Sequence, residues 1–251
     1  CLADDMGLGK TVQVLALFES RRRENIAQQR GPSLVVAPRS LVFNWKAEAS
    51  RFTPALRVRD HTGQMRRCDE DTFSECDVVL TTYGTLRRDA ATLSQMRFDY
   101  VVLDEAQSIK NAKTQAAKAA RLLKAGHRLA LSGTPIENHI GELWSLFEFL
   151  NPGMLGTAPV FSRLAGGTGR GSAIGSDEAG RGLLARAVRP FILRRTKQQV
   201  ARELPERIET TLSCELDTEE RRHYDELRSH YRQSLASKIA SAGLQRSKIH
   251  V

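Results

Sequence analysis

The sequence predicts an α/β fold in which a parallel β-sheet is flanked by helices, and two observations lead to it. Short apolar runs alternate with stretches of helical periodicity from Lys10 to Ser132, a pattern typical of a sheet with helices on both faces. A Gly-rich segment, residues 4–11, opens the first expected helix, and the acidic pair Asp104 and Glu105 directly follows a later apolar run. Ligands of such sheets bind outside the carboxyl ends of the strands, where we expect both segments to lie.

The expected strands are short apolar runs, and the expected helices connect them. The strands are 33–37, 56–60, 77–81, 98–103 and 127–132. The helices are 10–23, 41–51, 83–89 and 114–124. Gly126 follows the last of these helices and is interpreted as its stop.

The segment DDMGLGKT has the composition of a phosphate-binding loop. Gly7 and Gly9 allow backbone N–H groups to turn inward around phosphates, where a Cβ would interfere, and Leu8 lies between them in the same loop. Lys10 would place its charge on the terminal phosphates, and Thr11 would offer a hydroxyl to Mg²⁺. The strict pattern has Gly six residues before the lysine, where this chain has Asp4.

The acidic pair is the second half of the expected site. Asp104 would hold Mg²⁺ and its water, and Glu105 would orient or deprotonate an attacking water. Either segment alone is weak support, because a Gly-rich turn arises by chance. Both together, in this order, favour a nucleoside-triphosphate site with Lys10, Asp104 and Glu105 as the catalytic residues.

Composition narrows the function classes. The 251 residues carry a formal net charge of +9, which favours a polyanionic partner such as nucleic acid, although ordinary surfaces can also be basic. The cysteines show neither a CxxC pair nor a zinc-type spacing with histidine, so we expect reduced thiols in an intracellular protein. No apolar run approaches the roughly 20 residues of a membrane span, and no leader opens the chain, so we expect a soluble protein with no membrane partner.

Beyond residue 132 the alternation ends and helices are expected. Residues 142–150 predict a helix buried on a wide face, stopped by 151–153. Residues 166–182 are rich in Gly and Ser and predict a mobile loop, which we interpret as a plain flexible insertion. Residues 183–197 form a basic stretch with apolar positions.

A last helix is expected from Asp217, which forms a capping box with Glu220, to a stop at Gly243. Its stripe of apolar residues would dock on the sheet domain or on a partner. The stripe comprises Tyr224, Leu227, Tyr231, Leu235 and Ile239. We therefore divide the chain into a sheet domain, 1–155, an insertion, 156–182, and a helical region, 183–251.

The motifs in this order resemble the SWI/SNF-type DNA translocases, which are helicase-like ATPases of superfamily two. The matching segments cover nearly the whole chain: 2–11, 34–45, 79–84, 104–111, 131–138 and 189–197. The most specific are Ser-Gly-Thr-Pro-Ile from Ser132 and Arg-Arg-Thr-Lys from Arg194. The Ala and Arg content and the compact spacing are more similar to the bacterial members.

The resemblance implies the first RecA-like ATPase lobe, truncated at its N-terminus, and a helical protrusion. It implies ATP and Mg²⁺ as cofactors, and ATP-driven tracking along double-stranded DNA that displaces DNA-bound proteins such as RNA polymerase. It implies a nucleoid-associated cytoplasmic location in a bacterium and a nuclear one in a eukaryote. The second lobe, which supplies arginine fingers, and the adenine-reading segment are missing here, so we expect this chain alone to bind ATP weakly and hydrolyse it slowly.

Residues at the rim of the sheet are candidates for DNA contact. Pro38, Arg39 and Ser40 would present a helix N-terminus, a guanidinium and a hydroxyl to a phosphate, and Thr81 and Thr82 would repeat this at another strand. Such contacts read the DNA backbone and not the bases. The Pro-Arg-Ser segment is also consistent with a simple capped helix start.

The resemblance also assigns coupling and hinge residues. Gln107 replaces the commoner His of the acidic box, and Ser132, Gly133 and Thr134 would transmit loss of the γ-phosphate to the DNA track. The basic residues Arg194, Arg195 and Lys197, with Arg189 before them, are consistent with a solvated face, a DNA contact or an anchor for the second lobe. Trp45 and Trp144 are expected in the core.

Two other functions remain open at this stage. An RNA helicase of superfamily two would be stimulated by single-stranded RNA and would unwind it. A non-hydrolysing scaffold would hold nucleic acid or a protein and would tolerate loss of Lys10 or Glu105. The intact Lys10, Thr11, Asp104 and Glu105 argue against the scaffold.

Overall fold

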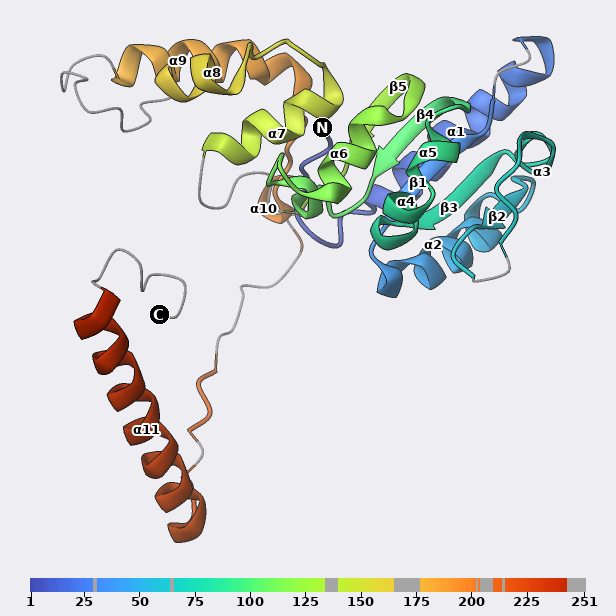
Figure 1. The fold of residues 1–251 in the computed structure, drawn as a ribbon. Coiled ribbons are helices and arrows are strands. Elements are labelled where there is room, and N and C mark those ends of the chain that lie inside the picture. Colours follow the sequence, from blue (N-terminus) through green and yellow to red (C-terminus); the bar gives the residue numbers. More distant parts are fainter. Residues whose placement is uncertain are drawn as a thin grey trace. The chain divides into compact units, whose positions relative to one another are not determined.

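The computed structural model describes residues 1–28, 31–63, 66–133, 140–164, 177–201, 203, 210–213 and 215–242. The chain divides into two compact units, residues 1–203 and 204–251 (Figure 1). The first unit carries the β-sheet and its helices, and the described part of the second carries one long helix.

The sheet has five parallel strands, which confirms the predicted fold class. The strands are β1 Ser33–Ala37, β2 Val58–Asp60, β3 Val78–Thr82, β4 Arg97–Leu103 and β5 Lys124–Ala130. Their order across the sheet is β2-β3-β1-β4-β5. All neighbouring strands run parallel, and Leu34 of β1 pairs with Val79 on one side and Val101 on the other.

Helices cover both faces of the sheet (Figure 1). On one face lie α1 Lys10–Gln28 and α2 Arg39–Phe52, whose apolar side chains pack with Val35 and Ala37 of β1. On the other lie α4 Tyr83–Arg88, α5 Ala90–Leu93, α6 Gln115–Leu122 and α7 Ile140–Leu150, which pack with Leu34 and Val36. Alternate residues of one strand therefore enter two cores, as expected for a sheet buried on both faces. A short helix, α3 Glu70–Ser74, precedes β3.

The predicted boundary near residue 124 is wrong. Helix α6 ends at Leu122, and the chain enters β5 at Lys124, so Gly126 lies within a strand and does not stop a helix. The buried Leu123 is extended, with φ −66° and ψ 135°, and ends the helical run. A Cβ on Gly126 would lie 3.3 Å from the carbonyl oxygen of Asp99, so the glycine permits close approach of β4 and β5.

The segment before the phosphate-binding loop extends the sheet beyond β5. Leu2 forms parallel bridges to Leu131 and to Leu193. The backbone N–H of Leu2 donates to Ala130 (2.8 Å), and that of Ala3 donates to Leu193 (2.7 Å). Residues near 193 therefore lie beside the start of the chain, an arrangement that the sequence alone did not predict.

A helical region follows the sheet within the first unit. Helix α7 confirms the predicted helix at 142–150, and Trp144 is partly buried and donates from Nε1 to the carbonyl of Gly156 (2.9 Å). Helices α7, α8 Ala158–Leu164 and α9 Asp177–Val188 share a small core of Leu143, Phe147, Phe161 and Val188. Both α8 and α9 reach into the expected insertion 156–182, whose residues 165–176 lie outside the described residues.

The second unit contains α11 Thr218–Ala242. The backbone N–H groups of Glu219 and Glu220 donate to Asp217 Oδ1 (2.9 and 2.8 Å), and the Glu220 carboxylate accepts from the N–H of Asp217 (3.3 Å), which confirms the capping box. Tyr224 and Tyr231 of the stripe are 52% and 63% exposed. The side chain of Ile239 and the stop at Gly243 lie outside the described residues. Among the helices that the structure describes, none is long and apolar enough to cross a membrane.

Candidate nucleotide-binding site

The glycine loop delivers a lysine to the carboxyl edge of the sheet. Gly7 and Gly9 have φ of 84° and 71°, values that favour glycine, and α1 begins at Lys10. The Lys10 ammonium donates to the carbonyl oxygens of Asp4 (2.6 Å) and Asp5 (3.1 Å). The positive charge is thus held within the loop by backbone oxygens, and the loop has the form that receives a phosphate group.

Asp104 lies at the end of β4 and is 8% exposed. Its Oδ2 accepts from Trp45 Nε1 (2.8 Å), and its Oδ1 accepts from the N–H of Glu105 (2.9 Å). Burial raises the pKa of Asp104, and these hydrogen bonds and the Lys10 charge oppose the rise without cancelling it. Leu2, before the loop, forms a bridge to Leu131 after β5, the neighbour of β4, so Lys10 and Asp104 lie at the same edge of the sheet. A buried carboxylate at this edge can bind a cation.

Glu105 has a strained backbone conformation. Its φ of 47° lies in the left-handed region, and no other non-glycine residue that the structure describes has a positive φ. Gln107 Nε2 donates to Glu105 Oε2 (2.6 Å), and the Ser132 hydroxyl donates to Gln107 Oε1 (3.4 Å). A chain of polar contacts therefore joins Glu105 to the segment that follows β5.

Gly133 connects the same segment to the glycine loop. A Cβ at Gly133 would lie 2.9 Å from Cγ of Met6, so a larger residue would displace the Met6 side chain of the loop. Of the four predicted coupling residues, Gln107, Ser132 and Gly133 lie at the site. Thr134 lies outside the described residues.

Tyr83 and Trp45 hold Asp104 in place, a role that the sequence analysis did not predict. The Tyr83 hydroxyl donates to the backbone carbonyl of Asp104 (2.7 Å), and burial raises the pKa of Tyr83 far above its usual value. Trp45 is 1% exposed, which confirms its place in the core, but its indole N–H also bonds the carboxylate. A buried Tyr or Trp needs a hydrogen-bond partner for its polar atom. This requirement is the sequence signal from which the roles of Tyr83 and Trp45 could have been predicted.

Asp4 explains the departure from the strict glycine pattern. Its side chain is fully buried, and Oδ1 accepts from the backbone N–H (2.9 Å) and Nε (3.1 Å) of Arg195. Burial alone would raise the pKa of Asp4, but the hydrogen bonds and charge of Arg195 outweigh it and lower the pKa. Arg195 also donates to Gln13 Oε1 (2.8 Å), so its guanidinium supports the glycine loop and α1.

The other basic residues lie nearby. The backbone N–H of Lys197 donates to Asp5 Oδ2 (3.0 Å), and Thr196 caps the short helix α10 Lys197–Val200. Arg194 is exposed, and Arg189 begins the 3-10 turn η2 Arg189–Phe191. The predicted DNA roles of Arg194, Arg195 and Lys197 stay predictions, and for Arg195 the structure offers the ion pair with Asp4 instead.

The predicted DNA rim forms only in part. Pro38 is the N-cap of α2, with Arg39 and Ser40 exposed in its first turn. Thr82, partly exposed, caps α4 and pairs in the sheet with Ala37, next to Pro38. Thr81 is fully buried and its hydroxyl donates to the carbonyl of His61 (3.1 Å), so the structure does not bring this side chain to the rim.

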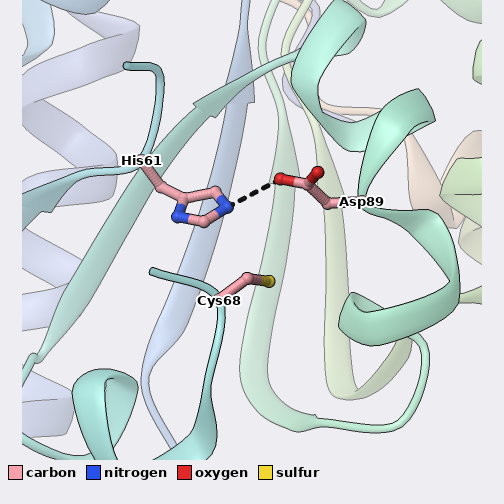
Figure 2. A group of neighbouring side chains, drawn as sticks. All are labelled: His61, Cys68 and Asp89. Atoms are coloured by element: carbon pink, nitrogen blue, oxygen red, sulfur yellow. Dashed lines mark hydrogen bonds and ion pairs between the residues drawn. The ribbon is translucent and has the colours of Figure 1, made fainter. Parts of the chain in front are cut away.

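A second cluster of titratable side chains lies away from the loop. Figure 2 shows the buried His61 imidazole directed at the Asp89 carboxylate (3.0 Å), with the Cys68 thiol nearby. The three offer ligand atoms within 4.8 Å of one another, and burial raises the pKa of Cys68 to about 11. Arg66 already donates to both oxygens of Asp89 (2.6 and 2.7 Å), and its guanidinium balances the charge of this carboxylate.

A glycine loop that opens a helix, beside a buried acidic residue at the end of a parallel strand, defines the class of P-loop nucleoside triphosphatases with a RecA-like fold. The sequence family described as the SNF2-related domain matches residues 1–250, and the chain belongs to this family.

Relatives and solved structures agree with this assignment. YwqA of Bacillus subtilis (strain 168) is 42% identical over 235 residues, which cover 90% of this chain and 25% of that protein. The TATA-binding protein-associated factor MOT1 of Saccharomyces cerevisiae is 36% identical over 269 residues, covering 100% of this chain and 14% of MOT1. The Sulfolobus solfataricus SWI2/SNF2 ATPase core in complex with dsDNA matches with a TM-score of 0.70 and 39% identity, over 98% of this chain and 50% of that one. The chain thus spans a quarter or less of these two relatives and half of the solved core.

Proposed function

We propose that this chain is the first ATPase lobe of a motor that couples ATP hydrolysis to movement along double-stranded DNA and displaces proteins bound there. The observation that carries the proposal is the convergence of Lys10 with the Asp104 and Glu105 pair at one edge of the sheet. Family membership and the likeness to an ATPase core in complex with dsDNA support it.

The site residues fit a magnesium-bound triphosphate. Lys10 would exchange its contacts with the Asp4 and Asp5 carbonyls for phosphate oxygens, and Thr11 and Asp104 would hold Mg²⁺. ATP, when bound, supplies the transferable phosphoryl group. The ionised form of Asp104, which burial disfavours in this structure, becomes favourable beside a divalent cation because the cation replaces the lost hydration.

Glu105 would orient the attacking water. Its hydrogen bond to Gln107 fixes one carboxylate oxygen, and Gln107 contacts Ser132 in turn. A movement of Glu105 would therefore be transmitted to Ser132 at the end of β5. Strand β5 lies two strands from β1, which leads into the exposed first turn of α2 with Arg39 and Ser40. This chain of contacts is our proposed route between hydrolysis and the DNA track.

DNA binding through this lobe would be independent of sequence. Arg39, Ser40 and Thr82 offer a guanidinium, a hydroxyl and a capped helix start, which are groups that bind phosphate oxygens. The displaced partner, RNA polymerase or another DNA-bound protein, would be set by parts of the protein outside this chain.

The test is the ATPase rate of the full-length protein with no nucleic acid, with duplex DNA and with single-stranded RNA. We expect duplex DNA to give the largest stimulation. Lys10→Ala should strongly weaken ATP binding, and Glu105→Gln should lower the rate by about 10² or more while ATP still binds. Stimulation by RNA alone would favour an RNA helicase, and nucleic-acid binding without ATP hydrolysis, unchanged in both variants, would favour a scaffold; either result contradicts the proposal.

A further inference from the structure

The segment after η2 is built onto the glycine loop through backbone and side-chain contacts. The N–H groups of Ala3 and Asp5 donate to the carbonyls of Leu193 (2.7 Å) and Arg195 (3.1 Å). In return, the N–H of Lys197 donates to the Asp5 carboxylate (3.0 Å). These bonds fix the position of the Lys197 backbone relative to the loop.

The side chain of Lys197 runs toward Gly7. Its Cε and Nζ both lie 3.7 Å from the position that a Cβ on Gly7 would take. Lys197 is exposed, and its ammonium has no ion-pair partner among the residues that the structure describes. A second ammonium, in addition to that of Lys10, therefore lies against the phosphate-binding loop.

Two ammonium groups, those of Lys10 and Lys197, lie at the glycine loop. Arg195 compensates the buried Asp4. The Lys10 ammonium donates to the backbone carbonyl of Asp5, and in the described part of the chain the Asp5 carboxylate accepts only from the backbone N–H of Lys197. The N-terminus of α1 adds its positive dipole end at Lys10. An anion of several charges would balance this arrangement, and a triphosphate is such an anion.

We propose that Lys197 is a further triphosphate-binding residue of this site, supplied by the segment after the helical region. The inference rests on the proposed function, since it assumes that the loop binds ATP. It assigns Lys197 to the nucleotide and not to duplex DNA. The positioning of Lys197 depends on Asp5, whose carboxylate holds its backbone.

The experiment measures the dissociation constant of Mg²⁺-ATP for the chain of residues 1–251 by titration with a fluorescent ATP analogue and competition by ATP. Lys197→Ala should raise the dissociation constant about 10-fold, the effect of losing one charge-assisted hydrogen bond. Lys197→Arg should recover most of the affinity because it retains the charge. Lys118→Ala on α6 is the matched control, since it also removes one exposed positive charge, and it should change affinity less than 2-fold. The thermal unfolding midpoint of each variant checks that the fold is kept.

Each outcome separates this inference from the proposed function. Equal affinities of Lys197→Ala and Lys118→Ala, with binding strongly weakened by Lys10→Ala, would overturn the inference and leave the proposed function intact. Weaker duplex DNA binding by Lys197→Ala with unchanged ATP affinity would assign Lys197 to DNA and overturn it as well. Failure of the unaltered chain to bind ATP at any concentration would overturn both.

Discussion

Asp104 is ionisable at a position where burial disfavours its charge. It is 8% exposed, and burial raises its pKa in spite of the hydrogen bond from Trp45 and the nearby Lys10. When folding raises the pKa of a carboxyl group, its protonated form stabilises the fold. This contribution is complete at pH values below the pKa of the unfolded chain, and it is lost as the pH rises through the pKa of the folded chain. The Asp104 carboxylate of the candidate site therefore lowers the free energy of unfolding at neutral pH in the absence of a cation.

We expect Asp104→Asn to make the chain more stable at pH 7 while it abolishes ATP hydrolysis. The amide carries no charge and keeps an oxygen for the Trp45 indole, while its NH2 group replaces the oxygen that accepts from the Glu105 N–H, which reduces the gain. Urea unfolding without Mg²⁺ should show the gain at pH 7, and the gain should disappear below about pH 4, where the wild-type carboxyl is protonated in both states. A loss of stability at pH 7 would contradict this account of Asp104.

The buried ion pair of Asp4 and Arg195 leads to a second prediction. Arg195→Ala leaves the fully buried Asp4 carboxylate without its main partner, and we expect a loss of about 2–3 kcal/mol of unfolding free energy at pH 7. The loss should be smaller than for a fully buried pair because the Arg195 side chain is 40% exposed to screening solvent.

The double variant is the control for this prediction. Asp4→Asn with Arg195→Ala removes both charges and should recover about 1 kcal/mol or more relative to Arg195→Ala alone. The lowered pKa of Asp4 means that the pair stabilises the fold above the unfolded carboxyl pKa and loses this effect as the pH falls through the folded value. The difference between wild type and Arg195→Ala should therefore shrink in acid, as measured by urea unfolding at several pH values.

Residue-level reasoning from sequence proposed the groups that would carry chemistry but did not predict the residues that hold them in place. Lys10, Asp104 and Glu105 stand in motifs whose residue types follow from phosphate and magnesium chemistry. Tyr83 contacts Asp104 across 21 positions and Arg195 contacts Asp4 across 191. Periodicity and spacing contain no information on such separations, because only the tertiary fold brings these residues together.

At the scale of the elements, the strands were predicted well because their patterns are local. All five expected strands form, and nine of their ten ends lie within two residues of the expected position. The start of β5 was not predicted because its first three residues have low strand propensity. They are Lys124, Ala125 and Gly126, and none of them is β-branched or aromatic. Pairing with β4 recruits them, with Ala125 opposite Phe98, and tertiary pairing outweighs their weak strand propensity.

The close approach of the chain at the starts of β1 and β4 leads to a prediction about stability. A Cβ on Gly31, just before β1, would lie 2.1 Å from the carbonyl oxygen of Arg97, the first residue of β4. Gly31→Ala should therefore destabilise the chain by about 2 kcal/mol or more, since a backbone atom must move. Gly63→Ala is the matched control: no atom lies within 4 Å of its Cβ, and its unfolding midpoint in urea should change little. Equal midpoints for the two variants would show that β1 and β4 do not approach as described.

For the whole molecule, the main prediction concerns the half of the matched ATPase core that this chain does not cover. The chain covers 50% of the SWI2/SNF2 ATPase core that it matches, and a second lobe supplies arginine fingers worth on the order of 10³ to 10⁵ in rate. We expect residues 1–251 alone to hydrolyse ATP at least about 10³ times more slowly than the full-length protein, in a steady-state phosphate-release assay. Rapid DNA-stimulated turnover by residues 1–251 would show that this lobe needs no partner.

The helical part was the least predictable from sequence. The capping box of α11 is a local pattern and was found, whereas the helices α8 and α9 extend into a region expected to be a plain insertion. Phe161 and Val188 supply the reason, because they join the core formed by α7. A few apolar residues in a Gly-rich region can order a helix when a neighbouring surface receives them.

The most direct test of the central claim is a double-mutant cycle on the affinity for Mg²⁺-ATP, with Lys10→Ala, Asp104→Asn and the double variant. Both side chains are proposed to act on one magnesium-bound triphosphate, so the two losses should not add, with a coupling energy of about 1 kcal/mol or more that disappears when EDTA removes Mg²⁺. Losses that add within about 0.5 kcal/mol, with or without Mg²⁺, would show that Lys10 and Asp104 act at separate sites.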